Sequence, residues 1–293
     1  MSNSLTDPIF IICQHRTGST FLKNLIDIHP GIHMVSEEMN LFDPWRTTLD
    51  TVIKNHTGSV DDLIEKIYEG NFHGTYFSTQ KLTKEKISKS LLKSLITNYK
   101  DPIDVLDAIL KAIRFSFKKE RIGVKFPIHW NGLDNLENKY LDAKFIFLVR
   151  NPYAMISSKL NHPGTIHRKK KYRILIPLIH LSTLLLFIYE FITYYKVYKV
   201  KAKNENVLLV RYEDLTDNVQ TELERIINFC ELDILNYDFL KIEKTSGQPS
   251  SNTGIKIEGS KNMNDISKQK LSSFDRKIIH LFLNGIMKKY SYL

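Results

Sequence analysis

An arginine, a glycine and several hydroxyl side chains follow the first apolar run of the chain. The run Pro8–Cys13 has the length of a strand buried on both faces, and helical spacing of apolar residues begins at Thr20. A turn between strand and helix suits an anion, because the first backbone N–H groups of the helix point at the ligand. Gly18 permits close approach of the backbone, but Arg16 precedes it, whereas a Walker A loop carries its lysine after its last glycine. The pattern predicts an anion site of another kind, with a tight turn that binds nothing as the alternative.

A second arginine stands at the end of the clearest buried strand, Lys144–Val149. Nucleotide hydrolases often place a magnesium-binding carboxylate at such a position, but this chain has Arg150, whose planar fork suits bidentate contact with a phosphate. A helix starts at Pro152, and Ser158 lies two turns along it, where its hydroxyl can reach the same anion. The alternative is an arginine that caps a loop and a serine on a helix face.

Composition and charge exclude several classes of protein. The 293 residues are 42% hydrophobic and 25% charged, which excludes a disordered chain, a collagen-like repeat and a disulfide scaffold. The net charge of +10 suits an anionic small ligand, an anionic membrane or nucleic acid. Most cations are scattered and no nucleic-acid motif is present, so we expect no nucleic-acid partner. Only the run Arg168–Arg173 is dense, either as a solvated charged segment or as the basic flank of an interfacial helix.

The two cysteines and the start of the chain bear on location. Cys13 and Cys230 lie in separate apolar segments, which favours two buried free thiols in a reducing compartment. Residues 1–8 lack the basic and apolar regions of a signal peptide. We therefore expect a cytoplasmic protein that can associate with membranes.

The order of the elements predicts an α/β fold. Apolar runs of strand length alternate with amphipathic segments, which is typical of a parallel sheet flanked by helices. We expect a single domain over residues 1–293, with helical insertions at 42–118 and 160–203 that shape an acceptor site. The expected strands are 8–13, 32–35, 121–125, 144–149 and 207–210. The expected helices are 20–28, 60–68, 84–98, 102–117, one from 152, 172–203, 217–230 and 266–289, with an irregular loop at 244–261.

Both motifs together resemble those of sulfotransferases that use 3′-phosphoadenosine 5′-phosphosulfate (PAPS). Arg16-Thr17-Gly18-Ser19-Thr20-Phe21 is similar to the phosphosulfate loop of that family, and Leu148 to Ser158 is similar to its 3′-phosphate motif. The segments 207–215 and 251–256 resemble its late strand and its C-terminal cofactor loop. The resemblance covers roughly residues 8–256. It implies a three-layer, P-loop-like sulfotransferase fold and the transfer of a sulfuryl group from PAPS, without a metal, to an acceptor hydroxyl.

The resemblance also implies a role for each matching residue. The 5′-phosphosulfate would be held by Arg16 and by the N–H groups around Gly18, and the 3′-phosphate by Arg150 and Ser158. Phe21 and Tyr212 would lie near the adenine, and Lys256 would close the C-terminal side, although its isoleucine neighbours depart from the family pattern. The full set of expected cofactor-binding residues is Arg16, Thr17, Gly18, Ser19, Thr20, Phe21, Arg150, Ser158, Tyr212 and Lys256.

Three charged residues complete the expected catalytic set. Arg16 and Lys125 would stabilise charge at the sulfuryl group, with a plain surface lysine as the alternative for Lys125. One branch of the family uses a glutamate shortly after a His-Pro pair, and here His29-Pro30 is followed by Glu37 and Glu38. We expect Glu38 to be the general base and Glu37 to be its alternative, unless the two are simply an acidic pair on a loop.

Two other classes of function stay open, as does the acceptor. The first is a nucleotide or small-molecule kinase on a related sheet, and the second is a non-catalytic, membrane-associated adaptor. The stretch Ile174–Val200 is rich in Leu, Ile and Tyr, and Pro177 and His180 interrupt it. It predicts a core helix or an interfacial helix, not a membrane span. An interfacial helix would favour a lipid or glycolipid acceptor over a soluble carbohydrate.

Overall fold

A computed structural model describes residues 7–35, 48–69, 87–96, 99–127, 130–242 and 260–293. Within these ranges five parallel strands form one sheet in the order β2-β3-β1-β4-β5. The strands are β1 (Ile9–Cys13), β2 (Ile32–Met34), β3 (Arg121–Pro127), β4 (Lys144–Val149) and β5 (Val207–Arg211). All five predicted strands are confirmed, and so is the α/β class. Because the strands are parallel, their carboxyl ends meet at one edge of the sheet.

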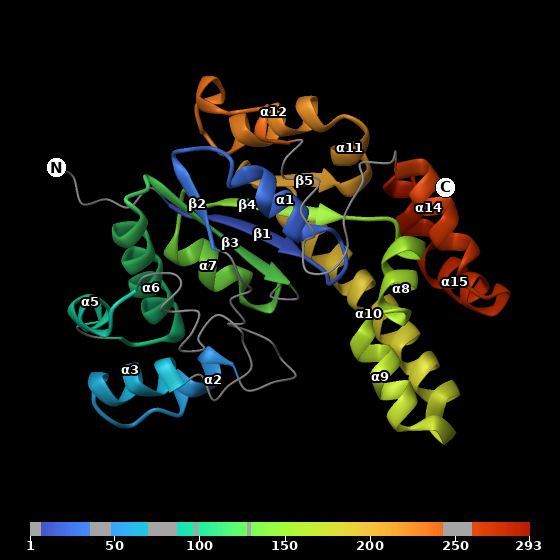
Figure 1. Ribbon diagram of the computed structural model, residues 1–293, viewed down its shortest axis with the longest axis horizontal. Helices are drawn as coiled ribbons and strands as arrows, with labels where there is room; N and C mark the ends of the chain where they lie inside the picture. Colours follow the sequence, from blue (N-terminus) through green and yellow to red (C-terminus); the bar gives the residue numbers. More distant parts are fainter. Residues whose placement is uncertain (1–6, 36–47, 70–86, 97–98, 128–129, 243–259) are drawn as a thin grey trace.

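Helices cover both faces of this sheet (Figure 1). The helices described are α1 (Ser19–Ile26), α2 (Leu49–Lys54), α3 (Val60–Glu69), α5 (Lys89–Leu95), α6 (Pro102–Phe117), α7 (Leu133–Lys139), α8 (Pro152–Leu160), α9 (Pro163–Lys171), α10 (Ile176–Lys201), α11 (Tyr212–Asp217), α12 (Val219–Phe229), α14 (Ser260–Gln269) and α15 (Ser273–Lys289). Short 3₁₀ helices are η1 (Trp130–Gly132), η2 (Arg173–Leu175) and η3 (Ile234–Asn236).

Side chains of the strands alternate between two apolar cores. From β1, Phe10 and Ile12 enter one core together with α6, α10 and α15. Ile9, Ile11 and Cys13 enter the other core together with α1 and α12. Both cysteines are buried free thiols, as predicted. The sheet is therefore the middle of three layers, and each layer of helices buries one apolar stripe against it.

The predicted helix 217–230 is confirmed as α12, which begins two residues later, at Val219. One helix that the sequence predicts as continuous is broken in the structure. The segment 266–289 belongs to α14 and α15, and Ser272 begins α15 with a capping box that Asp275 completes. Capping satisfies N–H groups that have no partner within the helix, so it fixes where a helix starts.

The long apolar segment has an exposed start and one buried side. Helix α10 begins at Ile176, after η2, and its buried side chains lie on one side of the helix between Ile179 and Tyr194. Tyr194 is 1% exposed, and its hydroxyl lies 3.0 Å from the carbonyl oxygens of both Ile12 and Leu148. It therefore joins α10 to the carboxyl ends of β1 and β4. The tyrosines of this region do not share one environment, because Tyr194 is buried whereas Tyr172 and Tyr189 are exposed.

Within the described residues one helical stretch, Arg173–Lys201, is long and apolar enough to cross a membrane by length and composition. Only 39% of its most apolar window is buried. The core contacts of its C-terminal half are those of a globular protein.

Candidate active site

The turn after β1 has a backbone shaped for close contact. Arg16 (φ 69°) and Gly18 (φ 90°) both adopt left-handed conformations, and the hydroxyl of Thr17 donates a hydrogen bond of 2.9 Å to the carbonyl of Gln14. Helix α1 starts at Ser19; its N-cap residue is Gly18, which has no side chain to cap the first N–H groups, and its first turn has no acidic residue. Free N–H groups at a helix start attract an anion.

Gly18 is fixed by a neighbour as well as by its φ angle. A Cβ atom at this position would lie 2.3 Å from Cε2 of Tyr212, the residue that follows β5. The ring of Tyr212 also makes an edge contact with Phe21, with centroids 6.2 Å apart. The turn after β1 and the start of α11 therefore pack as one unit.

The two sequence motifs meet through direct contacts. Nε of Arg16 donates a hydrogen bond of 2.9 Å to Oγ of Ser158, which lies on α8. Arg150 follows β4 and donates from Nη1 to the carbonyl oxygen of Arg16 at 3.3 Å. Residues 142 positions apart thus form one cluster of two guanidinium groups and a hydroxyl, here called the arginine pair site (Arg16, Arg150 and Ser158).

Arg150 is held in place but keeps hydrogen-bonding capacity. Its guanidinium carbon lies 4.3 Å from the centroid of the Tyr212 ring, a cation–π arrangement. Its Nε atom is buried and makes no hydrogen bond to any of the residues that the structure describes. A buried N–H group without a partner costs free energy. An anion at this position would remove that cost, so the residues present fit a phosphate.

Lys125 lies inside the site and is not a surface residue. It is 5% exposed, and β3 continues two residues beyond it to Pro127. Its Nζ lies 3.1 Å from Oγ1 of Thr20 in the first turn of α1. A cation therefore stands beside the same helix start that the turn after β1 leads into.

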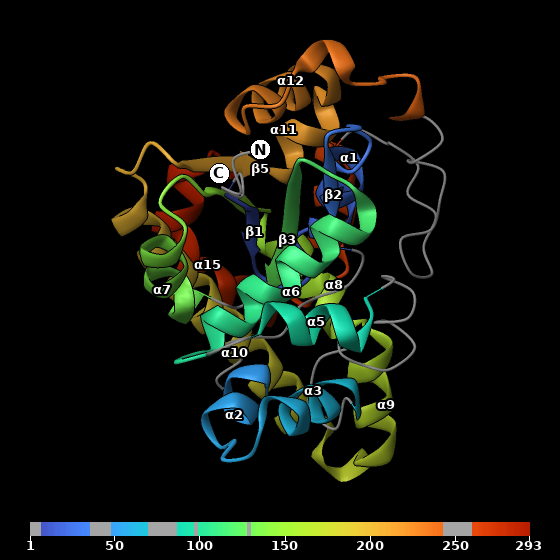
Figure 2. The same ribbon diagram turned by 90° about the vertical axis from the view of Figure 1, so that its left-hand side faces the viewer.

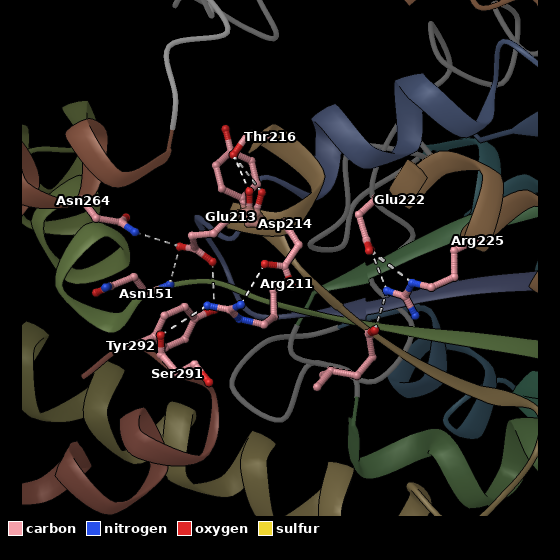
Figure 3. Close-up of polar contacts among 12 residues, drawn as sticks. Asn151, Arg211, Glu213, Asp214, Thr216, Glu222, Arg225, Asn264, Ser291 and Tyr292 are labelled. Carbon is pink, nitrogen blue, oxygen red and sulfur yellow. Dashed lines mark hydrogen bonds and ion pairs between the residues drawn. The ribbon is translucent and has the colours of Figure 1, made fainter. Parts of the chain in front are cut away.

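A buried carboxylate next to Tyr212, that of Glu213, ties four segments together (Figure 3). Glu213 accepts hydrogen bonds from the backbone N–H of Asn151 at 2.9 Å, from Nδ2 of Asn264 at 3.3 Å and from the hydroxyl of Tyr292 at 2.9 Å. Asn151 follows Arg150, and its side chain accepts from the N–H of Tyr153 at the start of α8. Glu213 thereby positions the segment that carries Arg150.

Sequence reasoning missed three polar residues near the site. Glu213 is one. His162 caps the start of α9, and burial lowers its pKa, as do the nearby charges of Arg16 and Lys159. Gln14 is buried at the end of β1, and its Nε2 has no hydrogen-bond partner in the described part of the chain. The Gln-His-Arg sequence of the turn was the available signal for Gln14, whereas no local pattern identifies the other two.

Three of the expected site residues, Glu37, Glu38 and Lys256, lie outside the described residues. Phe21 is buried in the core beside α12. Among the described residues, no three His, Cys, Asp or Glu side chains gather as a metal site would require. The roles predicted for Glu37, Glu38, Lys256 and Phe21 stay predictions.

The comparisons with known proteins agree on one family. A model of the sulfotransferase family matches residues 8–236. The chain is similar to the sulfotransferase domain from the curacin biosynthetic pathway, with 17% identity, coverage of 95% of this chain and 98% of that one, and a TM-score of 0.58. It is also similar to the sulfotransferase domain of the olefin synthase of Synechococcus PCC 7002, with 19% identity, coverage of 93% and 91%, and a TM-score of 0.56. No curated protein matches the chain.

The family match spans more than half of the chain, so the protein belongs to the sulfotransferase family. The two structural similarities show the same fold. The resemblance found in the sequence is therefore confirmed at the level of family and fold.

Proposed function

We propose that this protein transfers a sulfuryl group from PAPS to an acceptor hydroxyl. The observation that carries the proposal is the arginine pair site, which joins the turn after β1 to the segment after β4. Two guanidinium groups beside a free helix start form a site for a ligand with more than one anionic group. PAPS has a 3′-phosphate and a 5′-phosphosulfate, which matches that demand.

The donor would be held through its two anionic ends. Arg150 and Ser158 would bind the 3′-phosphate, and the buried Nε of Arg150 supports this assignment. The N–H groups from Gly18 to Thr20 would bind the 5′-phosphosulfate. Arg16 belongs to that turn and donates a hydrogen bond to Ser158, so its guanidinium group would lie between the two anionic groups and contribute positive charge to both.

In the proposed reaction, the bond between sulfur and the oxygen of the 5′-phosphate breaks as the acceptor oxygen bonds to sulfur. The acceptor hydroxyl loses its proton to a general base, for which we propose Glu38, with Glu37 as the alternative. Adenosine 3′,5′-bisphosphate leaves with the added negative charge. Lys125 and the first N–H groups of α1 would stabilise that charge, and their positions are set by the fold before the donor binds.

The test combines binding with turnover. Calorimetry should show binding of adenosine 3′,5′-bisphosphate without metal and no binding of ADP with Mg²⁺; the reverse result would favour a kinase. PAPS labelled in the sulfuryl group, offered with carbohydrate, lipid and glycolipid alcohols, should then yield a labelled acceptor. Binding without transfer to any acceptor would favour an adaptor.

A further inference from the structure

The connection between α9 and α10 is an exposed tip at one end of the molecule (Figures 1 and 2). Every residue from Lys170 to Leu178 is exposed, and we call this segment the helical tip. It contains both cations and large apolar side chains, and Ile174 is 95% exposed. Exposed apolar side chains gathered in one place indicate an interaction surface more strongly than single ones do.

The apolar surface continues from the tip along one side of α10. Leu181, Leu185, Leu186 and Tyr189 are exposed on the first half of the helix. The intervening Leu184, Phe187 and Ile188 are buried in the core. Core packing therefore explains only one side of this helix, and the other side is an apolar strip continuous with the tip.

The charge of this region identifies the kind of partner. Residues 151–189 contain no Asp or Glu, but they contain six cations: Lys159, Arg168, Lys169, Lys170, Lys171 and Arg173. More than half of the net charge of +10 is thus concentrated in one short segment. Lys170, Lys171 and Arg173 are exposed within the helical tip itself.

We propose that the helical tip binds the surface of an anionic lipid bilayer. Cations beside exposed Ile, Leu and Tyr side chains match a boundary where anionic headgroups meet acyl chains. A second copy of this chain fits less well, because a two-fold interface would bring the same cations together. This inference does not depend on the proposed sulfuryl transfer.

The binding mode is peripheral. The stretch Arg173–Lys201 is long enough to cross a bilayer, but its C-terminal half carries Tyr194 and Phe191, which are buried in the core. Crossing would remove these side chains from the core and break the contacts of Tyr194 with β1 and β4. Insertion of the tip and of the exposed strip leaves the core intact.

The charge component is tested by flotation with phosphatidylcholine vesicles that contain phosphatidylserine. The full chain should float at low salt and dissociate as salt screens the charges. Replacing Lys170, Lys171 and Arg173 with glutamine should weaken binding about 100-fold, since each cation near an anionic surface contributes about fivefold. The matched control replaces Lys196, Lys199 and Lys203, three exposed lysines near the other end of α10, and should float like wild type.

The apolar component needs its own pair of variants. Replacing Ile174 and Leu178 with serine should reduce flotation at every salt concentration, whereas replacing Leu235 and Leu240, which are also exposed and lie elsewhere, should not. Binding of adenosine 3′,5′-bisphosphate or the circular dichroism spectrum would show that each variant is folded.

Several outcomes would overturn the proposal. One is equal loss of flotation in the variant of Lys170, Lys171 and Arg173 and in its lysine control. Others are no flotation of the folded wild type, and a wild-type dimer in light scattering that the Ile174 and Leu178 variant abolishes. The last result would assign the surface to a second copy. Capture of an acidic protein without any binding to vesicles would count against lipid in the same way.

Discussion

Replacing Arg150 with alanine should weaken binding of adenosine 3′,5′-bisphosphate far more than binding of adenosine 5′-phosphate. The two ligands differ only in the 3′-phosphate that Arg150 is proposed to bind. Alanine removes the buried Nε, which has no partner among the described residues, and the stacking of the guanidinium on Tyr212. Only the first loss depends on the 3′-phosphate, because the stack on Tyr212 is present without any ligand.

The magnitude follows from these contacts. A hydrogen bond to a charged group contributes about 1.5–3 kcal/mol, so a bidentate contact from Arg150 contributes about 3 kcal/mol or more, which is roughly 150-fold in Kd. The cation–π contact contributes about 0.5–2 kcal/mol. Its loss leaves the Tyr212 ring less fixed, which should change the affinity for both nucleotides equally. The ratio of the two affinities therefore isolates the phosphate contact.

Isothermal titration calorimetry with both ligands measures that ratio. Arg150→Lys is the control that keeps the charge but lacks the planar fork, and it should recover only part of the affinity. Ser158→Ala should weaken binding of adenosine 3′,5′-bisphosphate by about tenfold or more, because its hydroxyl would donate one hydrogen bond to a charged phosphate. Equal losses for both nucleotides in Arg150→Ala would refute the assignment of Arg150 to the 3′-phosphate.

Glu38→Gln should lower turnover by about 10²–10⁴-fold with the donor affinity unchanged, and a dead Glu37→Gln beside a normal Glu38→Gln would move the base to Glu37. Gly18→Ala should lower the free energy of unfolding by about 2 kcal/mol or more in urea titrations, because a left-handed φ and a clash with a tyrosine ring coincide; an unchanged midpoint would contradict this. Burial alone would raise the pKa of Asp275. Hydrogen bonds, including one from His180, outweigh the effect of burial, so the net pKa lies below its usual value. The stability from this carboxylate is present above the unfolded pKa and lost as pH falls through the folded one, so stability should decline more steeply below about pH 4 in wild type than in Asp275→Asn.

The sheet could be predicted because each strand is a short apolar run bounded by polar residues. All six residues of β4 are buried, as expected for a central strand of a parallel sheet that is covered on both faces. Helix boundaries were harder, because the apolar spacing of 266–289 continues through the break at Ser272. The sequence Ser272-Ser273-Phe274-Asp275 carries a capping signal that would have located the start of α15.

The site could be predicted in its motifs but not in its contacts. The spacing suggested that Ser158 serves the ligand of Arg150, whereas in the structure it accepts a hydrogen bond from Arg16. Contacts between side chains more than a hundred residues apart depend on strand order and on rotamers, which local patterns do not encode. Glu213 shows the same limit, since its partners Asn264 and Tyr292 come from the C-terminal helices.

The position of Tyr194 makes α10 a spacer between two ends of the molecule. Its hydroxyl holds the helix at the strand ends that lead to Arg16 and Arg150. From Ile176 to Tyr194 an α-helix rises about 27 Å. If only the helical tip contacted a bilayer, an upright α10 would hold the proposed donor site about that far from the headgroups. If the exposed strip up to Tyr189 also inserted, α10 would lie tilted and the site would come closer, so the depth of insertion would determine how far an acceptor hydroxyl must project from the lipid surface.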